Sequence, residues 1–416
     1  MAAACTGGGD GATLQTTVGP TLPPTTSTTV RSRLPGPLRI GVIVPRTGDA
    51  ASFGPPLLAG IQLAAQDINA AGGVNDERIE VVEPRDEGKE PDAALELIRD
   101  GAVDAIIGPA SSPDALAVAE TVNQARIVTC SPTAGSIALT KFGNRYIFRT
   151  MPSDALEGAA LAKVLSQSGL GSAAVVYPDD GYGQEIFKQL RDHLESGVVK
   201  LPFSAAYNPN GTVDSFNAIA GQLVAADPRM VVVIGLAESG GRMLSALRDA
   251  PGAGRVNRWY VSAAMRQPNL FEKVAPGRAD GLQDVLGVSP VADPQLASFT
   301  SALKAVSRDA SGAYAAYAYD CLNLIALAAQ VAKSNDPKDF RDYLVEVSRA
   351  GVTCTTFASC AGNAAQRPPL NFDYEGVSGP VDLDDNGDIS AARYELFGFD
   401  TSGRDVAKNV TFTAPP

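Results

Sequence analysis

Hydroxyl side chains follow two neighbouring apolar runs of the sequence, at the point where each run ends. Ser111 and Ser112 precede one proline, and Ser131 precedes another, with Thr133 after it. A serine followed by proline is typical of a helix start, where free backbone N–H groups and the helix dipole favour an anion. The four residues therefore predict either plain helix caps or one side of a site for a carboxylate.

The elements that must position these residues alternate between strands and helices. Short apolar runs at residues 38–44, 105–107 and 127–129 are predicted strands, and segments with apolar residues at helical spacing separate them. Such alternation is typical of an α/β fold with parallel sheets, in which ligands bind beyond the carboxyl ends of the strands. The pattern restarts at residues 173–177 and continues with the apolar strand 230–234. We therefore expect two doubly wound lobes.

Composition and charge argue against several classes of function. The 416 residues are 45% hydrophobic and 19% charged, enough for two or more globular units. A net charge of -12 argues against nucleic acid or an anionic membrane surface as a partner. The sole histidine, His193, falls on the polar side of a predicted helix, which argues against a Ser-His-Asp triad, a Cys-His pair and a histidine metal site. We therefore predict a protein that is not an enzyme and that uses no cofactor or metal.

Several segments resemble the type I periplasmic binding proteins, in particular the leucine/isoleucine/valine-binding family of ABC importers. The similarity rests on TGDAASFG with QDINAAGGV, on IIGPASS with SPTAGSIALT, and on YPDDGYGQE. It implies two α/β lobes joined by a hinge of three crossings, one of residues 38–150 with 288–376 and the other of residues 151–287 with 377–416. It also implies an extracytoplasmic protein that closes on an amino acid or related small carboxylate and delivers it to an ABC permease. We expect it to be a monomer.

The resemblance implies ligand contacts at the loops of both lobes. The matching positions are Phe53, Ser111, Ser112, Ser131, Thr133, Gly135, Tyr182 and Ala264. The serine loops would hold the ligand's α-carboxylate, with Gly135 standing where relatives carry a hydroxyl. Phe53 either covers the ligand or staples the following helix. Tyr182 either closes over the ligand or is an exposed ring.

The acid that pairs with a ligand ammonium in this family is missing from its usual loop. This chain has Ala263 and Ala264 there. A buried ammonium without a partner costs several kcal/mol. Either Glu238 takes over the role, or the ligand has no amine and the same fold serves as a sensor or regulatory subunit for an amine-free carboxylate. Glu238 could equally face water at a helix start.

The five cysteines predict different chemistry. Cys5, after three alanines, resembles the lipidation site of a bacterial lipoprotein, with residues 1–37 as signal remnant and disordered tether; the alternative is an incidental thiol in a tail. Cys354 and Cys360 predict a small disulfide-closed loop. Cys130 and Cys321 are either buried thiols or a second bridge.

The later part of the chain holds a calcium-like spacing and two hinge segments. Residues 382–388 match a calcium loop, but Arg393 stands where a bidentate Glu is required, so we predict a hairpin turn of Asp-Asn-Gly type. Residues 281–289 are predicted to form the second crossing between lobes. Tyr319 and Asp320 are predicted to be hinge and core structure.

Overall fold

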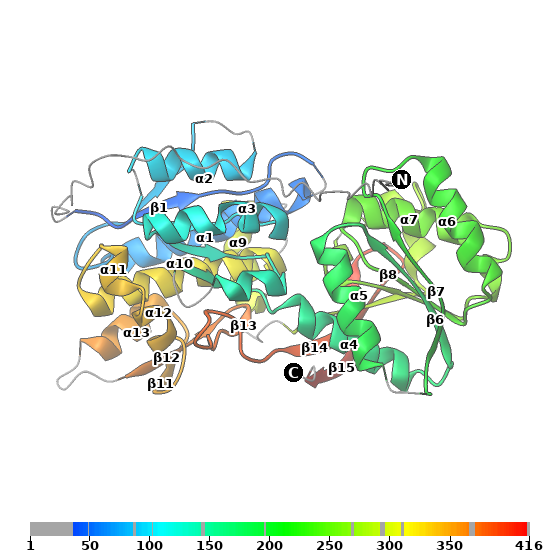
Figure 1. The fold of residues 1–416 in the computed structure, drawn as a ribbon. Helices are drawn as coiled ribbons and strands as arrows, with labels where there is room; N and C mark the ends of the chain where they lie inside the picture. Colours follow the sequence, from blue (N-terminus) through cyan, green and yellow to red (C-terminus); the bar gives the residue numbers. More distant parts are fainter. Residues whose placement is uncertain are drawn as a thin grey trace, which may run out of the picture. The chain divides into compact units, whose positions relative to one another are not determined.

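The computed structural model describes residues 36–48, 50–85, 89–101, 103–142, 146–194, 197–267, 270–291, 296–308, 312–365 and 371–413. The predicted lipidation at Cys5 and the predicted tether up to residue 35 lie outside this part of the chain. Residues 35–416 form one unit. Within it, the strands assemble into two large sheets, which Figure 1 shows side by side.

The first lobe is built around a parallel sheet of five strands in the order β2-β1-β3-β4-β5. The strands are β1 (Arg39–Val42), β2 (Glu80–Val82), β3 (Ala105–Ile107), β4 (Val128–Ser131) and β5 (Ile147–Arg149). The helices between them are η1 (Ala51–Phe53), α1 (Gly54–Ala70), α2 (Glu90–Arg99), α3 (Ser112–Ala125) and η2 (Ile137–Lys141). Alternate side chains enter two cores: Ile107 packs with α1, whereas its neighbour Ile106 packs with α2 and α3.

The second lobe is built around a sheet of seven strands in the order β15-β14-β10-β9-β8-β6-β7. The strands are β6 (Ser172–Pro178), β7 (Lys200–Tyr207), β8 (Met230–Val233), β9 (Arg258–Val261), β10 (Val285–Pro290), β14 (Arg393–Phe399) and β15 (Asp405–Thr413). The helices are α4 (Asp154–Gln167), α5 (Gly181–His193), α6 (Val213–Ala225), α7 (Ala237–Asp249), η3 (Ala253–Arg255), η4 (Ala263–Met265), α8 (Leu270–Val274) and η5 (Ala279–Leu282). Strands β6 to β10 are parallel, and β14 and β15 are antiparallel. The predicted α/β fold with parallel sheets is confirmed.

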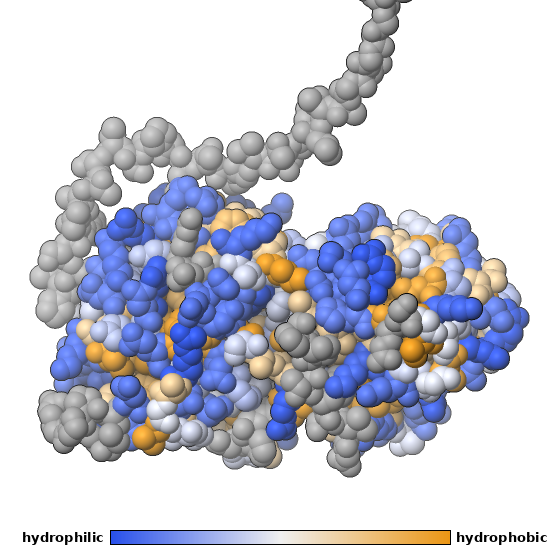
Figure 2. Space-filling view, turned by 60° about the horizontal axis from the view of Figure 1, so that its bottom comes forward, coloured by the Kyte–Doolittle hydropathy of each residue, from blue (hydrophilic) through white to orange (hydrophobic). Residues whose placement is uncertain are grey.

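The chain then returns to the first lobe. The elements of this return are α9 (Leu296–Val306), α10 (Gly312–Ala332), α11 (Pro337–Phe340), α12 (Tyr343–Glu346), β11 (Val352–Cys354), α13 (Phe357–Ala364), β12 (Phe372–Gly376) and β13 (Gly379–Pro380). Helix α10 lies against α1 so closely that a Cβ at Gly60 would be 2.1 Å from the Ala315 carbonyl oxygen. Within the described residues, Tyr314–Ala332 is the one helical stretch long and apolar enough to span a membrane, and 83% of it is buried. The face in Figure 2 is mostly hydrophilic with small apolar patches. Because most of this stretch is buried, we interpret α10 as a core helix.

In the described part of the chain, the lobes are connected after β5, after β10 and before β14. Residues 285–290 pair with β9 on one side and with β14 on the other. The predicted crossing at 281–289 is therefore corrected to a point after Pro290, and the expected boundary at 288 moves with it. Val377 and Ile389 pack in the core of the first lobe, so the second lobe resumes at β14 and not at residue 377. Pairing with a strand far later in the chain leaves no local sequence signal, which explains both differences.

Candidate functional site

The serines at the start of α3 are held by hydrogen bonds within the first lobe. Ser111 is the N-cap of α3: its Oγ accepts from the Asp114 N–H at 3.2 Å and donates to the Asp114 carboxylate at 2.6 Å. Ser112 is buried, and its Oγ accepts from the Ser136 N–H at 3.1 Å. The bond between Ser112 and Ser136 ties the start of α3 to the loop after β4.

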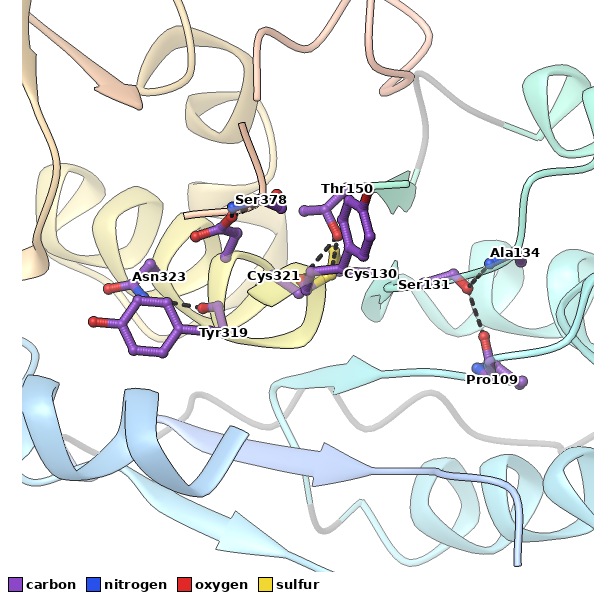
Figure 3. The surroundings of a disulfide bond; sticks show 11 residues. Pro109, Cys130, Ser131, Ala134, Thr150, Tyr319, Cys321, Asn323 and Ser378 are labelled. Carbon is purple, nitrogen blue, oxygen red and sulfur yellow. Dashed lines mark hydrogen bonds between the residues drawn. A yellow bond between two sulfur atoms is a disulfide. The ribbon is translucent and has the colours of Figure 1, made fainter. Parts of the chain in front are cut away.

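The hydroxyls after β4 are also committed to the protein. Ser131 is 1% exposed, and its Oγ donates to the Pro109 carbonyl at 2.6 Å and accepts from the Ala134 N–H at 3.2 Å (Figure 3). Thr133 donates to the Ala110 carbonyl at 2.7 Å. Because both hydroxyl protons are used by carbonyls, these side chains shape the loop in this structure and have no proton left for a carboxylate.

Gly135 makes room for a carboxylate of the second lobe. A Cβ at Gly135 would lie 1.9 Å from Asp154 Oδ1, and the Asp154 N–H donates to the Gly135 carbonyl at 2.8 Å. Asp154 is the first residue of α4 and is 5% exposed, and its Oδ2 is buried without a hydrogen-bond partner. Burial, and next the charge of Glu157, raise the pKa of Asp154 well above its usual value. The loop that was predicted to hold a ligand carboxylate therefore faces a carboxylate of the protein.

Glu157 lies one helical turn further along α4, on the same face as Asp154. It is 7% exposed, and its Oε1 accepts from the Ala263 N–H at 2.7 Å. Burial raises the pKa of Glu157 to about 7, although the hydrogen bond from Ala263 lowers it. The loop after β9 lacks the expected acid in its own sequence. It therefore contacts an acid that helix α4 supplies.

Two aromatic side chains were predicted to contact the ligand, Tyr182 and Phe53. The Tyr182 hydroxyl, in the first turn of α5, is buried and makes no hydrogen bond of normal geometry. Burial, and next the charges of Glu157 and Asp154, raise its pKa. Phe53 is 6% exposed and lies 4.6 Å, between ring centroids, from Tyr314 of α10. The Tyr182 hydroxyl and the Phe53 ring are therefore both buried inside the protein.

The structure gives Glu238 a partner away from these residues. Its carboxylate lies 2.6 Å from Lys273 Nζ of α8, and its side chain is 45% exposed. The hypothesis that Glu238 replaces the missing acid is corrected accordingly: this acid sits in the first turn of α7, where it complements the helix dipole. Ala264, also predicted as a contact, is half-buried and packs against the core of the first lobe.

Direct contacts join the two lobes around this group. The Glu185 carboxylate of α5 accepts from the Ile137 N–H at 2.7 Å and from Ser136 Oγ at 3.1 Å. The Tyr314 hydroxyl donates to the Ala263 carbonyl at 3.2 Å. The loop after β4, the start of α4, the start of α5 and the loop after β9 therefore meet between the lobes.

A cavity of about 170 Å³ lies elsewhere, beside the crossings. Thr150, Tyr317, Ser378 and Arg393 are among its lining residues, and neither Asp154 nor Glu157 is. It contains none of the residues predicted to bind the ligand, so we do not assign the site to it.

The comparisons with known proteins identify the family. Residues 37–370 match the family model described as periplasmic binding protein. The chain belongs to the periplasmic binding protein family. The resemblance stated from the sequence is thereby confirmed.

Named relatives and solved structures extend the match. The leucine-, isoleucine-, valine-, threonine- and alanine-binding protein of Pseudomonas aeruginosa is 26% identical over 82% of this chain and 86% of its own length. The leucine-specific-binding protein of Salmonella typhimurium is 24% identical over 88% and 92%. The branched-chain amino acid transporter substrate-binding protein LivJ of Streptococcus pneumoniae, solved with isoleucine, has a TM-score of 0.74 at 21% identity, covering 91% of this chain and all of its own. A solute-binding protein of an ABC transporter from R. palustris, solved with 4-hydroxybenzoate, has a TM-score of 0.71 at 19% identity, covering 91% and 98%.

The acids of the calcium-like turn at residues 382–388 bind other groups of the protein. Asp388 lies 2.7 Å from Arg149 Nε and accepts from Thr140 Oγ1 at 2.6 Å. Asp384 accepts from the Asn386 N–H at 2.8 Å, as in a tight turn. Within the described residues, no group of three or more His, Cys, Asp or Glu side chains could hold a metal ion.

Asp154, Glu157 and Glu185 were not predicted from the sequence. Acids in the first turn of a helix are ordinary complements of its dipole, so Asp154 and Glu157 gave no sign of a site. Two departures from the family resemblance, taken together, could have indicated the two acids of α4. One is the acid absent from the loop at Ala263, and the other is Gly135 in place of a hydroxyl. These two gaps lie beside Glu157 and Asp154 respectively.

Proposed function

We propose that the protein is the extracytoplasmic solute-binding protein of an ABC importer, and that it binds a small solute with a protonated amine, such as an amino acid, between its lobes. Binding without catalysis is part of the proposal. It is supported by the family membership and by the relatives described above, which are binding proteins.

One observation carries the proposal: Asp154 is a buried acid whose Oδ2 has no hydrogen-bond partner. An unpaired buried carboxylate is costly, whereas a carboxylate that meets an ammonium in a dry site gains a charge-assisted hydrogen bond. A ligand ammonium beside Asp154 would remove this cost. We therefore assign the ligand's amine to Asp154 and keep its carboxylate, if it has one, at the N-terminal end of α3.

The remaining expectations belong to the same proposal. Ligand closes the lobes on each other and excludes water, and a membrane permease recognises the closed form. Lipidation of Cys5 holds the protein at the membrane through the tether that precedes the first lobe. The protein acts as a monomer and does not bind nucleic acid, in keeping with its net charge of -12.

A thermal-shift screen tests the assignment of the amine. The panel contains the common amino acids, the same molecules without the α-amine, and the same molecules without the carboxylate. A ligand at 100 times its dissociation constant should stabilise the fold by roughly 2.7 kcal/mol. We expect amine-bearing ligands to stabilise the wild type and Asp154→Asn to abolish the shift, while Glu238→Gln, an exposed acid outside the site, leaves it unchanged.

A receptor for an aromatic carboxylate is the second candidate. The aromatic rings of Phe53, Tyr182 and Tyr314, and the R. palustris structure with 4-hydroxybenzoate, favour it. The same screen separates the two candidates. Stabilisation by 4-hydroxybenzoate or by an amine-free acid, retained in Asp154→Asn, would replace the first proposal with the second.

A further inference from the structure

The cavity beside the crossings is lined by all three of them. Thr150 and Pro152 belong to the first crossing, Pro290 and Val291 to the second, and Ile389 to the third. Its volume is about 170 Å³, which is large enough for several waters or a small organic molecule. Because the lobes turn about these crossings, a change of hinge angle must change the shape of the cavity.

Two side chains of the lining carry hydrogen-bond donors without a partner among the described residues. The Tyr317 side chain is 7% exposed, and its hydroxyl makes no hydrogen bond to any of these residues. The Arg393 guanidinium, exposed at the start of β14, forms no hydrogen bond or ion pair with them either. Both groups are therefore available to a molecule in the cavity.

The other polar side chains of the lining have their protons committed to the protein. The Thr150 hydroxyl donates to the Tyr317 carbonyl at 2.9 Å, and the Ser378 hydroxyl donates to the Asp320 carboxylate at 2.6 Å. No aspartate or glutamate is among the described residues that line the cavity, and most of the lining is proline, alanine, valine or isoleucine. A cation would find no counter-charge there, whereas an anion would meet a guanidinium and a hydroxyl donor.

We propose that this cavity binds a small monocarboxylate with a short apolar chain, which holds the hinge at its present angle. The carboxylate accepts from Arg393 and from the Tyr317 hydroxyl, and the apolar chain packs against the prolines of the crossings. A guanidinium matches a carboxylate in both charge and geometry. The site goes beyond the proposed function, because its occupant regulates the hinge and is not the solute delivered to the permease.

The hinge angle favoured by this occupant is one at which the lobes touch. In the structure that contains the cavity, Glu185 of one lobe accepts from Ser136 and Ile137 of the other. A ligand that binds one arrangement better shifts the population toward that arrangement. Occupancy should therefore raise solute affinity, and the solute should raise carboxylate affinity by the same factor. This coupling rests on the proposed function, whereas binding of the carboxylate does not.

Calorimetric titration with isobutyrate tests the site without any solute. Isobutyramide has nearly the same shape and no charge, so it is the matched probe, and both are titrated at constant ionic strength. We expect the wild type to bind isobutyrate at least about tenfold more tightly than isobutyramide. Equal binding of the two, or binding of neither, would overturn the proposal.

Three variants locate the bound carboxylate. Arg393→Gln removes the guanidinium, and Tyr317→Phe removes a hydroxyl that bonds to no described residue, so each should weaken isobutyrate about tenfold. Arg229→Gln, which changes an exposed arginine directly before β8, is the matched control and should leave the affinity within about twofold. Thermal unfolding checks that each variant is folded. Undiminished binding of isobutyrate by folded Arg393→Gln would contradict the proposed site.

Asp154→Asn separates this cavity from the site between the lobes, because Asp154 does not line the cavity. The variant should keep its affinity for isobutyrate. An amine-free acid belongs to the cavity when Arg393→Gln abolishes its binding, and to the second candidate function when binding persists in that variant. Failure of every amino acid to bind overturns the proposed function and leaves the cavity site standing.

Discussion

At the scale of single residues, the absence of a side chain at Gly135 leaves the space that the Asp154 carboxylate occupies. Any side chain at position 135 would collide with that carboxylate. One glycine in a loop and one acid on a helix thus form a single feature, although 19 positions separate them in the sequence.

Glu157 should make stability depend on pH. Its pKa is raised from 4.5 to about 7 in the folded protein. Below pH 4.5, Glu157 is protonated in both the folded and the unfolded protein. Between pH 4.5 and about 7, Glu157 ionises in the unfolded chain but keeps its proton in the folded protein, so the free energy of unfolding falls as the pH rises across this window. The slope is at most about 1.4 kcal/mol per pH unit.

Glu157→Gln removes this dependence. The free energy of unfolding of the wild type minus that of the variant should therefore decline across the window and level off above it. Urea titrations at a series of pH values measure this difference, with Glu120→Gln, an exposed acid of α3, as the control. Parallel curves for wild type and Glu157→Gln would contradict the buried state of this acid.

At the scale of elements, α10 connects the candidate site to the crossings. Its Asp320 accepts from the Ser378 N–H at 2.8 Å and from the Tyr374 hydroxyl at 2.7 Å, and burial raises the pKa of Asp320 to about 6. Thr150, in the first crossing, donates to the Tyr317 carbonyl at 2.9 Å. The helix that carries Tyr319 and Asp320 therefore contacts the first crossing and the turn between β12 and β13 of the first lobe.

Two disulfides tie elements together over very different spans. Cys130 joins β4 to Cys321 of α10, with Cα atoms 5.7 Å apart and a separation of 191 residues (Figure 3). The disulfide predicted between Cys354 and Cys360 is present and spans a separation of 6 residues. The first bond lies directly before Ser131, so it also fixes the loop after β4 against the helix.

Removal of the longer-range bond should cost more stability. Loop-closure entropy predicts a loss of roughly 5 kcal/mol for Cys130→Ala with Cys321→Ala and about 2 kcal/mol for Cys354→Ala with Cys360→Ala. Urea unfolding of the two double variants measures the losses, and each variant is the other's control. Equal losses, or a larger loss for the short loop, would contradict the placement of the first bond across the lobe.

At the scale of the whole molecule, the fold was more predictable than the site. Apolar runs and 3.6-residue spacing are local, so the α/β class and the continuous strand at residues 230–234 could be predicted from the sequence. The family followed from the resemblance of several loop motifs to those of known binding proteins. The crossing after β10 and the return of residues 377–389 to the first lobe depend on pairing and packing with distant segments. The acids of the candidate site depend on which face of α4 turns toward the other lobe, which helix-start residues do not reveal.

The lobes are joined at the site by Glu185, which accepts two hydrogen bonds from Ser136 and Ile137. Residues from four segments, none adjacent in the chain, contribute to the same group. The central claim is that this group between the lobes, centred on Asp154, receives the amine of a small solute.

A crystal structure of the complex with the tightest ligand of the screen tests this claim most directly. We predict the ligand between the two lobes, with its α-ammonium about 2.7 to 2.9 Å from Asp154. A ligand in the cavity beside Thr150 and Tyr317, or one whose nitrogen points away from Asp154, would contradict the account.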